Sequence, residues 1–232
     1  MKNGIIYQGP SLLDGAPIVV IANYSKSNRK TGGVVQTYII RADMNPLEAS
    51  KTGADFSICG DCKHKGTPTD DKTRKTAAKR TCYVILGQGV LVTYRAFLRG
   101  YYPKADNFEA RAAIGKGRIV RLGTYGDPAA VPDYVWEQLL SGADSWLAYS
   151  HQSGWRADLA MQSADTMAQA IAHWQAGRRT FRVVQALAEV DKAREVLCPA
   201  SAEAGRRTTC EACKLCAGLA TKSPKSVAIV QH

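Results

Sequence analysis

Short apolar runs separated by polar loops recur along the whole chain, and the clearest lies at residues 118–128 (RIVRLGTYGDP). The apolar first half of this run predicts a buried strand, and its two glycines predict a tight turn that ends at Asp127. A segment with helical start and stop signals follows at 133–142. Strand, acidic loop and helix together form the repeating unit of α/β proteins, whose ligands gather at the carboxyl ends of the strands.

The same unit recurs often enough to predict a fold. Helical spacing or capping signals predict further helices at 46–53, 90–101, 107–115 and 166–177. Seven more runs predict strands, at 17–22, 34–41, 83–86, 146–149, 158–162, 180–184 and 226–231. Strands that alternate with crossovers predict a compact (β/α)8-type parallel barrel, formed as one domain by residues 1–232.

Composition and charge indicate the kind of partner. With 232 residues and 45% hydrophobic content, the chain can bury a sizeable core. No leader precedes a long apolar run, so we expect a cytoplasmic protein without a membrane, in the host cytoplasm if it is viral. The net charge of +11 favours DNA or RNA as a partner. The basic residues expected to contact phosphates cluster in one loop and include Lys72, Arg74, Lys75, Lys79 and Arg80.

Cysteine spacing predicts two metal-binding segments. In an insertion at 198–216 the ligands are Cys198, Cys210, Cys213 and Cys216, the last three on two-residue spacings. A closed four-thiolate zinc site is expected, although iron–sulfur clusters use the same spacing. A second Cys/His metal-binding loop is predicted at 59–82. Its expected ligands are Cys59, Cys62, His64 and Cys82.

Polar residues at the ends of the predicted strands are the candidates for chemistry. In a barrel they would share one mouth, where neighbouring carboxylates can hold different protonation states. Helix capping is the alternative role, most directly for Asp165, which precedes a helix. Phosphate-binding loops, nucleophile elbows and dinucleotide fingerprints are absent from the sequence. The candidates are Asp43, Asp127, Ser150, His151, Gln152, Ser163, Asp165 and His232.

A basic barrel with strand-end aspartates and a late cysteine-rich site resembles the tRNA-guanine transglycosylase superfamily. That superfamily includes relatives that insert 7-deazaguanine bases into phage and bacterial DNA. Asp127, Asp165 and the 198–216 segment carry the resemblance, although the family's metal site has the pattern C-x-C-x2-C with a distant histidine. The chain is also shorter than typical members.

The resemblance implies exchange of guanine for a 7-deazaguanine-type base through an aspartate-linked glycosyl intermediate. Asp127 or Asp165 would be the nucleophile and the other would be the acid or base. Asp43 is a further candidate for one of these two roles. An extruded nucleotide would need hydrogen bonds and a stacking partner, and the candidates in the strand ends can supply both. These substrate-binding candidates are Tyr125, Ser150, His151, Gln152 and Ser163.

Two other functions fit the same residues. One is a zinc-stabilised nucleic-acid-binding protein without catalysis, and the other is an iron–sulfur enzyme on a related barrel. A homodimer is compatible with each of them. We expect an enzyme, a glycosyltransferase, as the first hypothesis.

Overall fold

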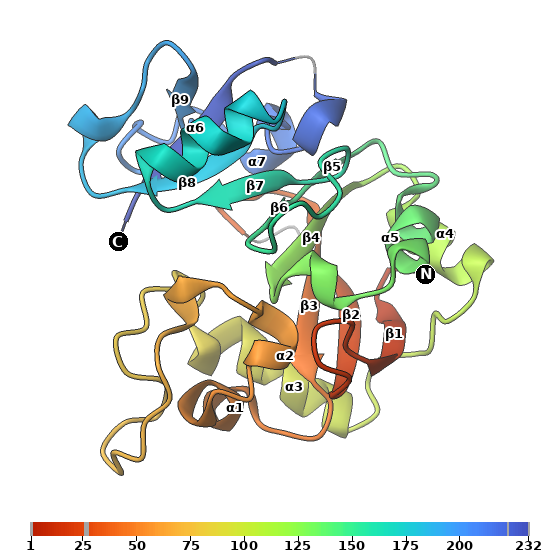
Figure 1. Ribbon diagram of the computed structural model, residues 1–232. Coiled ribbons are helices and arrows are strands. Elements are labelled where there is room, and N and C mark those ends of the chain that lie inside the picture. Colours follow the sequence, from red (N-terminus) through yellow and green to blue (C-terminus); the bar gives the residue numbers. More distant parts are fainter. Residues whose placement is uncertain (1, 26–27, 222, 232) are drawn as a thin grey trace.

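The computed structural model describes residues 2–25, 28–221 and 223–231 and contains two five-stranded sheets (Figure 1). The first sheet has the order β1-β2-β3-β4-β5 and the second the order β6-β7-β8-β10-β9. In the first sheet β1 to β3 are antiparallel, whereas β4 and β5 run parallel to β3. Its strands are β1 (Gly4–Pro10), β2 (Pro17–Ser25), β3 (Val34–Arg41), β4 (Ile119–Tyr125) and β5 (Ser145–Leu147).

Helices cover both faces of the first sheet. On one face Val19, Ile21 and Ile40 pack against helix α3 (Leu91–Leu98). On the other face the alternate strand residues, such as Ile18 and Val20, belong to the core that also contains the helices α2, α4 and α5. Successive side chains of β2 and β3 point to opposite faces of the sheet, so these two strands contribute to both cores. The remaining bounds are α1 (Pro46–Thr52), α2 (Phe56–Cys59), α4 (Phe108–Gly115) and α5 (Asp133–Leu140).

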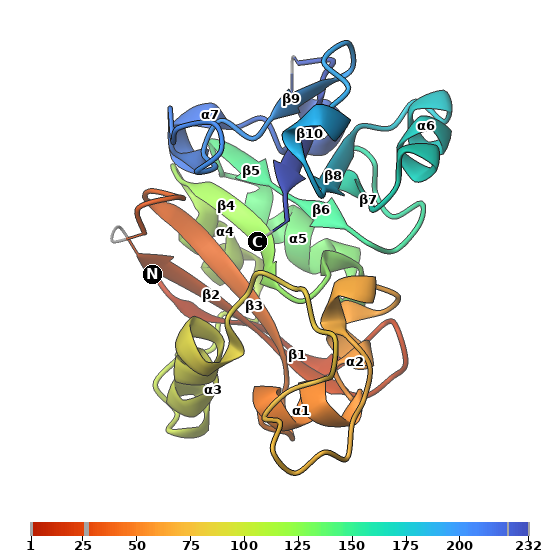
Figure 2. The ribbon, with the colours of Figure 1, turned by 90° about the vertical axis from the view of Figure 1, so that its left-hand side faces the viewer.

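The second sheet is parallel throughout. It lies on the side of the first sheet where β4 and β5 are (Figure 2). Helix α6 (Met167–Gln175) contacts β7 and β8. Helix α7 (Cys210–Cys213) is a single turn within the cysteine-rich segment. The strands are β6 (Tyr149–Ser150), β7 (Met161–Ala164), β8 (Thr180–Val184), β9 (Glu195–Leu197) and β10 (Ser226–Val230).

One extended segment joins the two sheets. Its first part, β5, pairs with β4, and its second part, β6, pairs with β7, so the break falls at the fully buried Ala148. The Ala148 N–H donates to the Cys216 carbonyl at 2.7 Å, and its carbonyl accepts from the Met161 N–H at 3.0 Å. The cysteine-rich segment is therefore hydrogen-bonded at the point where the sheets separate.

The predicted closed (β/α)8 barrel is wrong. Several parallel strands do follow one another in chain order from β3 onward, but they are divided between two open sheets. Among the described residues, the outer strands are β1 and β5 in the first sheet and β6 and β9 in the second, and neither sheet closes on itself. The antiparallel pairs β1-β2 and β2-β3 prevent a purely parallel fold, because parallel strands need long crossovers and these three strands have short connections.

Individual elements agree better with the sequence pattern. The strands predicted at 34–41 and 180–184 are confirmed, as are strands near 17–22, 118–127 and 226–231 and the five predicted helices. The strand predicted at 83–86 is wrong, because Leu86 begins one turn of π-helix that leads into α3. The strand predicted at 158–162 begins later, since a turn stabilised by Arg156 occupies its first positions.

No described helix combines the length and the apolar character that crossing a bilayer requires.

A buried ion pair fixes the outer part of the second sheet. The Arg182 guanidinium donates to both oxygens of Glu195, at 2.8 and 2.6 Å, and the two side chains are 3% and 0% exposed. The Asp191 N–H also donates to Glu195, at 2.9 Å. The pair thus links β8 to β9 across the intervening β10.

We expect Glu195→Gln to lower the free energy of unfolding by about 3–5 kcal/mol, because a buried guanidinium would lose its counter-charge. Urea unfolding followed by circular dichroism measures this loss. Glu189→Gln is the matched control, since the backbone carbonyl of Glu189, and not its carboxylate, accepts from Arg182. Equal effects of the two substitutions would contradict the role given to the pair.

Candidate functional site

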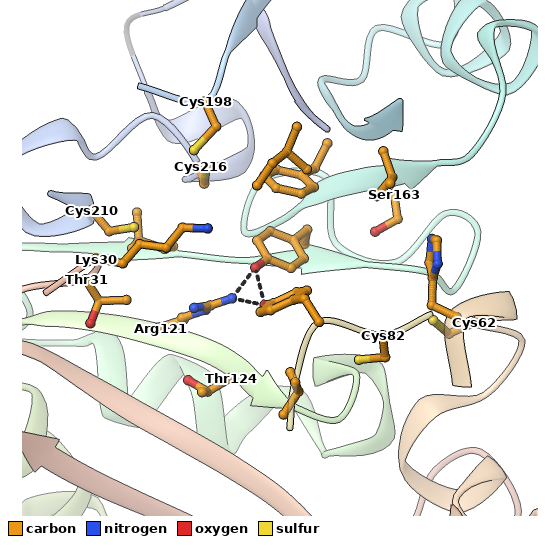
Figure 3. Close-up of a pocket in the computed structure, with 18 of the residues that line it drawn as sticks. Lys30, Thr31, Cys62, Cys82, Arg121, Thr124, Ser163, Cys198, Cys210 and Cys216 are labelled. Carbon is orange, nitrogen blue, oxygen red and sulfur yellow. Dashed lines mark hydrogen bonds between the residues drawn. The ribbon is translucent and has the colours of Figure 1, made fainter. Parts of the chain in front are cut away.

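A cavity of about 420 Å³ lies between the two sheets (Figure 3). Tyr38 and Arg121 line it from the first sheet, and Tyr149 and Phe181 line it from the second. The Tyr149 and Phe181 rings are stacked, with centroids 4.4 Å apart. The volume falls within the range of about 300–1,000 Å³ that is typical of small-molecule sites. The cavity therefore has the size and the aromatic walls of a ligand site.

Two histidines and an aspartate meet at one end of this cavity. Ligand atoms of His64, His151 and Asp165 all lie within 4.8 Å of one another. The His64 Nε2 atom is 2.8 Å from an Asp165 carboxylate oxygen, and the two imidazole rings are 5.9 Å apart. Two imidazoles and one carboxylate are a ligand set that proteins use for divalent iron and related ions. The geometry is thus suited to a metal ion.

Neighbouring groups orient these three side chains. The His64 Nδ1 atom is 2.8 Å from the Thr81 hydroxyl, which holds the ring from the side opposite Asp165. Asp165 precedes α6, but Thr166 is the N-cap of that helix and forms a capping box with Gln169. The Asp165 side chain is therefore free of the capping role that its sequence position suggested, and it points to His64 and Lys63.

The same surroundings shift the pKa values of the site. Burial raises the pKa of Asp165, but the hydrogen bond and charge of His64 outweigh burial and hold it below the usual value. Burial lowers the pKa of His151, against the opposing effect of Asp127. Both shifts favour an ionised carboxylate beside a neutral imidazole, which are the protonation states that bind a metal.

Asp127 is buried, and hydrogen bonds occupy both of its oxygens. One oxygen accepts from the Ser150 hydroxyl at 2.7 Å and from the Ala129 N–H at 3.0 Å. The other accepts from the His151 N–H at 2.6 Å and lies 4.0 Å from the ring of that histidine. This carboxylate holds the end of β6 against the turn after β4. It positions His151, and it does not line the main cavity.

The other predicted substrate and catalytic residues are dispersed. Ser163 lines the cavity, and its buried hydroxyl has no hydrogen-bond partner among the described residues. Gln152 instead donates to the Cys59 carbonyl at 3.2 Å. Asp43 forms an ion pair with Arg41 and lines neither the main cavity nor a second, smaller one. Tyr125 is buried beside that smaller cavity, and within the part of the chain that the structure describes its hydroxyl has no hydrogen-bond partner. The candidate His232 lies outside the described residues.

A second, smaller cavity of about 70 Å³ adjoins the first and contains the early cysteines. Cys59, Cys62 and Cys82 line it, while His64, predicted as their fellow ligand, faces His151 and Asp165 instead. Burial raises the pKa of Cys62 to about 12 and that of Cys59 well above its usual value. The predicted set of three cysteines and one histidine is therefore divided between two neighbouring places.

The basic loop contains mostly exposed cations. Lys72, Arg74, Lys75 and Lys79 are exposed, and none of the ion pairs between described residues includes them. Arg80 is half-buried, and its guanidinium donates to the Cys82 carbonyl at 3.0 Å. Four of the five predicted phosphate contacts are thus free to meet an anion in solution.

Sequence reasoning missed Arg121, which lies near the middle of the cavity (Figure 3). Its guanidinium donates to the hydroxyls of Tyr83 and Tyr149, and it forms none of the ion pairs between described residues. A signal was present, because Arg121 interrupts the apolar run that forms β4. A cation whose partners are neutral hydroxyls can attract an anionic ligand.

Scans against protein-family models, curated proteins and solved structures found no match to this chain.

Replacing Asp127 by Asn tests its positioning role. An amide has one acceptor oxygen, so at least one of the three donors that Asp127 accepts from would lose its partner, and the free energy of unfolding should fall by about 1–3 kcal/mol. Chemical denaturation measures the change. Asp43→Asn is the control, because its exposed pair with Arg41 is worth less than about 1 kcal/mol. An unchanged stability for Asp127→Asn would contradict this role.

Proposed function

We propose that the protein is a metal-dependent enzyme that acts on a nucleotide, either free or as a unit of DNA or RNA. The convergence of His64, His151 and Asp165 at the end of an aromatic cavity carries this proposal. A divalent ion held by these residues would polarise an oxygen atom or activate water. Two histidines and one carboxylate leave further coordination positions for such ligands.

The cavity supports the substrate class. Rings of Tyr38, Tyr83 and Phe181 line it and offer surfaces on which a base can stack. Arg121 can pair with a phosphate, because an arginine fork matches phosphate oxygens. The exposed cations of the basic loop, together with a net charge of +11, favour a nucleic-acid strand as the carrier of the nucleotide.

Metal chemistry is favoured over base exchange through an aspartate. The resemblance to transglycosylases implies a carboxylate that is free to attack a sugar carbon. Both oxygens of Asp127 are occupied, and Asp165 is bonded to His64 and paired with Lys63 at 3.5 Å. Asp165 is thus arranged as a ligand rather than as an attacking group.

Binding of Mn²⁺ tests the metal centre, because manganese prefers oxygen and nitrogen ligands and the cysteines compete weakly for it. We expect one Mn²⁺ per chain by calorimetry and electron paramagnetic resonance. Each of His64→Ala, His151→Ala and Asp165→Asn should weaken binding by at least about tenfold, since loss of supporting groups alone costs that much. His173→Ala, in α6, is the control. Failure of the wild type to bind Mn²⁺, or equal weakening in the control, would refute the centre.

Replacing Arg121 tests the anion site. We expect Arg121→Gln to weaken binding of nucleoside monophosphates by about tenfold or more, because a charge-assisted bond to phosphate contributes about 1.5–3 kcal/mol. Binding of the corresponding nucleosides, which lack the phosphate, should change little. Calorimetry on both ligands distinguishes loss of a phosphate contact from damage to the cavity, since damage would weaken both equally.

A further inference from the structure

Three of the four cysteines of the 198–216 segment, Cys198, Cys210 and Cys216, lie at the end of the cavity opposite the histidines (Figure 3). Cys198 follows β9, and Cys210 and Cys213 begin and end α7. The Cys216 carbonyl accepts from the Ala148 N–H at the break between the sheets. All are free thiols, and Cys198, Cys210 and Cys216 line the cavity. Cys198, Cys210 and Cys216 also share one apolar cluster with Met161.

These thiols are close enough to affect one another electrostatically. Burial raises the pKa of Cys216, and Cys198, Cys210 and Cys213 raise it further. Burial is also the main cause of the raised pKa of Cys210, where Cys198 and Cys213 add to the effect and Arg121 and Lys30 oppose it. Each of the four thiols therefore has the others as neighbours.

Their sulfur atoms do not converge as closely as the ligand atoms of the histidine end. Among the described residues, three ligand atoms lie mutually within 4.8 Å only at His64, His151 and Asp165, so no three sulfurs do. Sulfurs on a single tetrahedral zinc lie about 3.8 Å apart, because each Zn–S bond is about 2.3 Å. The thiolates of a four-iron cluster bind separate iron atoms and stand farther apart.

We propose that Cys198, Cys210, Cys213 and Cys216 bind a [4Fe–4S] cluster. The spacing supports it, because Cys210-x2-Cys213-x2-Cys216 repeats the run found in four-iron ferredoxins, and Pro199 follows Cys198 as a proline follows the last cysteine of that pattern. This inference does not depend on the proposed function of the histidine end.

The surroundings can balance the charge of such a cluster. A cubane with four thiolates is anionic, and Arg121 and Lys30 are the cations beside Cys210. Hydrogen bonds hold Cys210 in place, because its N–H donates to the Lys30 carbonyl at 3.0 Å and the next N–H, of Glu211, donates to the Thr31 carbonyl at 3.0 Å. A cluster here would place an electron carrier in the wall of the substrate cavity.

Anaerobic reconstitution of the full chain with ferrous iron and sulfide tests the proposal. We expect broad visible absorption that bleaches with dithionite. The reduced cluster should give an electron paramagnetic resonance signal at low temperature. The double variant C210S/C213S should contain about four irons and four sulfides fewer per chain than the wild type. C59S/C82S, which changes the other cysteine set, should keep those four irons and four sulfides, and Asp165→Asn should keep the wild-type sulfide content.

Two results would overturn the proposal. One is equal iron and sulfide in the wild type and in C210S/C213S. The other is a wild type that takes up no sulfide-dependent iron but binds one zinc, with a tetrathiolate spectrum after cobalt substitution. The wild-type measurements decide the question even if C210S/C213S unfolds, which far-ultraviolet circular dichroism would reveal. A wild type that contains the cluster but does not bind Mn²⁺ would refute the metal centre at the histidines and would leave the cluster proposal intact.

Discussion

The architecture depends on one strand that serves two sheets. Residues 145–150 pair with β4 before Ala148 and with β7 after it. At Ala148 itself the N–H leaves both ladders and donates to the Cys216 carbonyl, while the carbonyl accepts from the Met161 N–H at the start of the β6-β7 ladder. Because a buried backbone must satisfy both its donor and its acceptor, this position can be a break only while those two segments stay in place. The two sheets diverge from here, and the cavity occupies the space between them.

The site follows from this divergence. The turn after β4 and the end of β6 would separate if nothing joined them, and the Asp127 carboxylate bonds to both. The same carboxylate fixes His151, which faces His64 across 5.9 Å. The arrangement places two imidazoles, from segments far apart in the sequence, at one end of the cavity. Arg121 stands between that end and the cysteines.

Local patterns predicted the elements, but their assembly depended on contacts that no local pattern contains. Residues 34–41 were predictable because β-branched side chains fill both faces of that strand. The apolar pattern did not predict the strand at 4–10, because two glycines and a proline leave it only a few apolar residues. The barrel was a wrong inference from strand count, since the direction of β2 relative to β1 and β3 is set by short turns and not by periodicity.

The candidate site was predictable in its residue types and only partly in its grouping. His151, Asp165 and Ser163 were chosen for their positions after strands, and all three line the cavity. His64 was assigned to cysteines next to it in sequence, whereas its partner Asp165 lies 101 residues away. Asp127 was chosen as a reactive group because its backbone is constrained, yet that constraint reflects its role in holding three donors.

The docking of α7 on the loop before β3 has a consequence for the order of biosynthesis. That loop is synthesised before its partners at Cys210 and Glu211, the latter 178 residues after Gly33, to which its carboxylate is hydrogen-bonded. Until those residues are made, one wall of the cavity is missing. Any inorganic group bound by all four late cysteines can therefore be inserted only after the segments that carry His64, His151 and Asp165 have been synthesised.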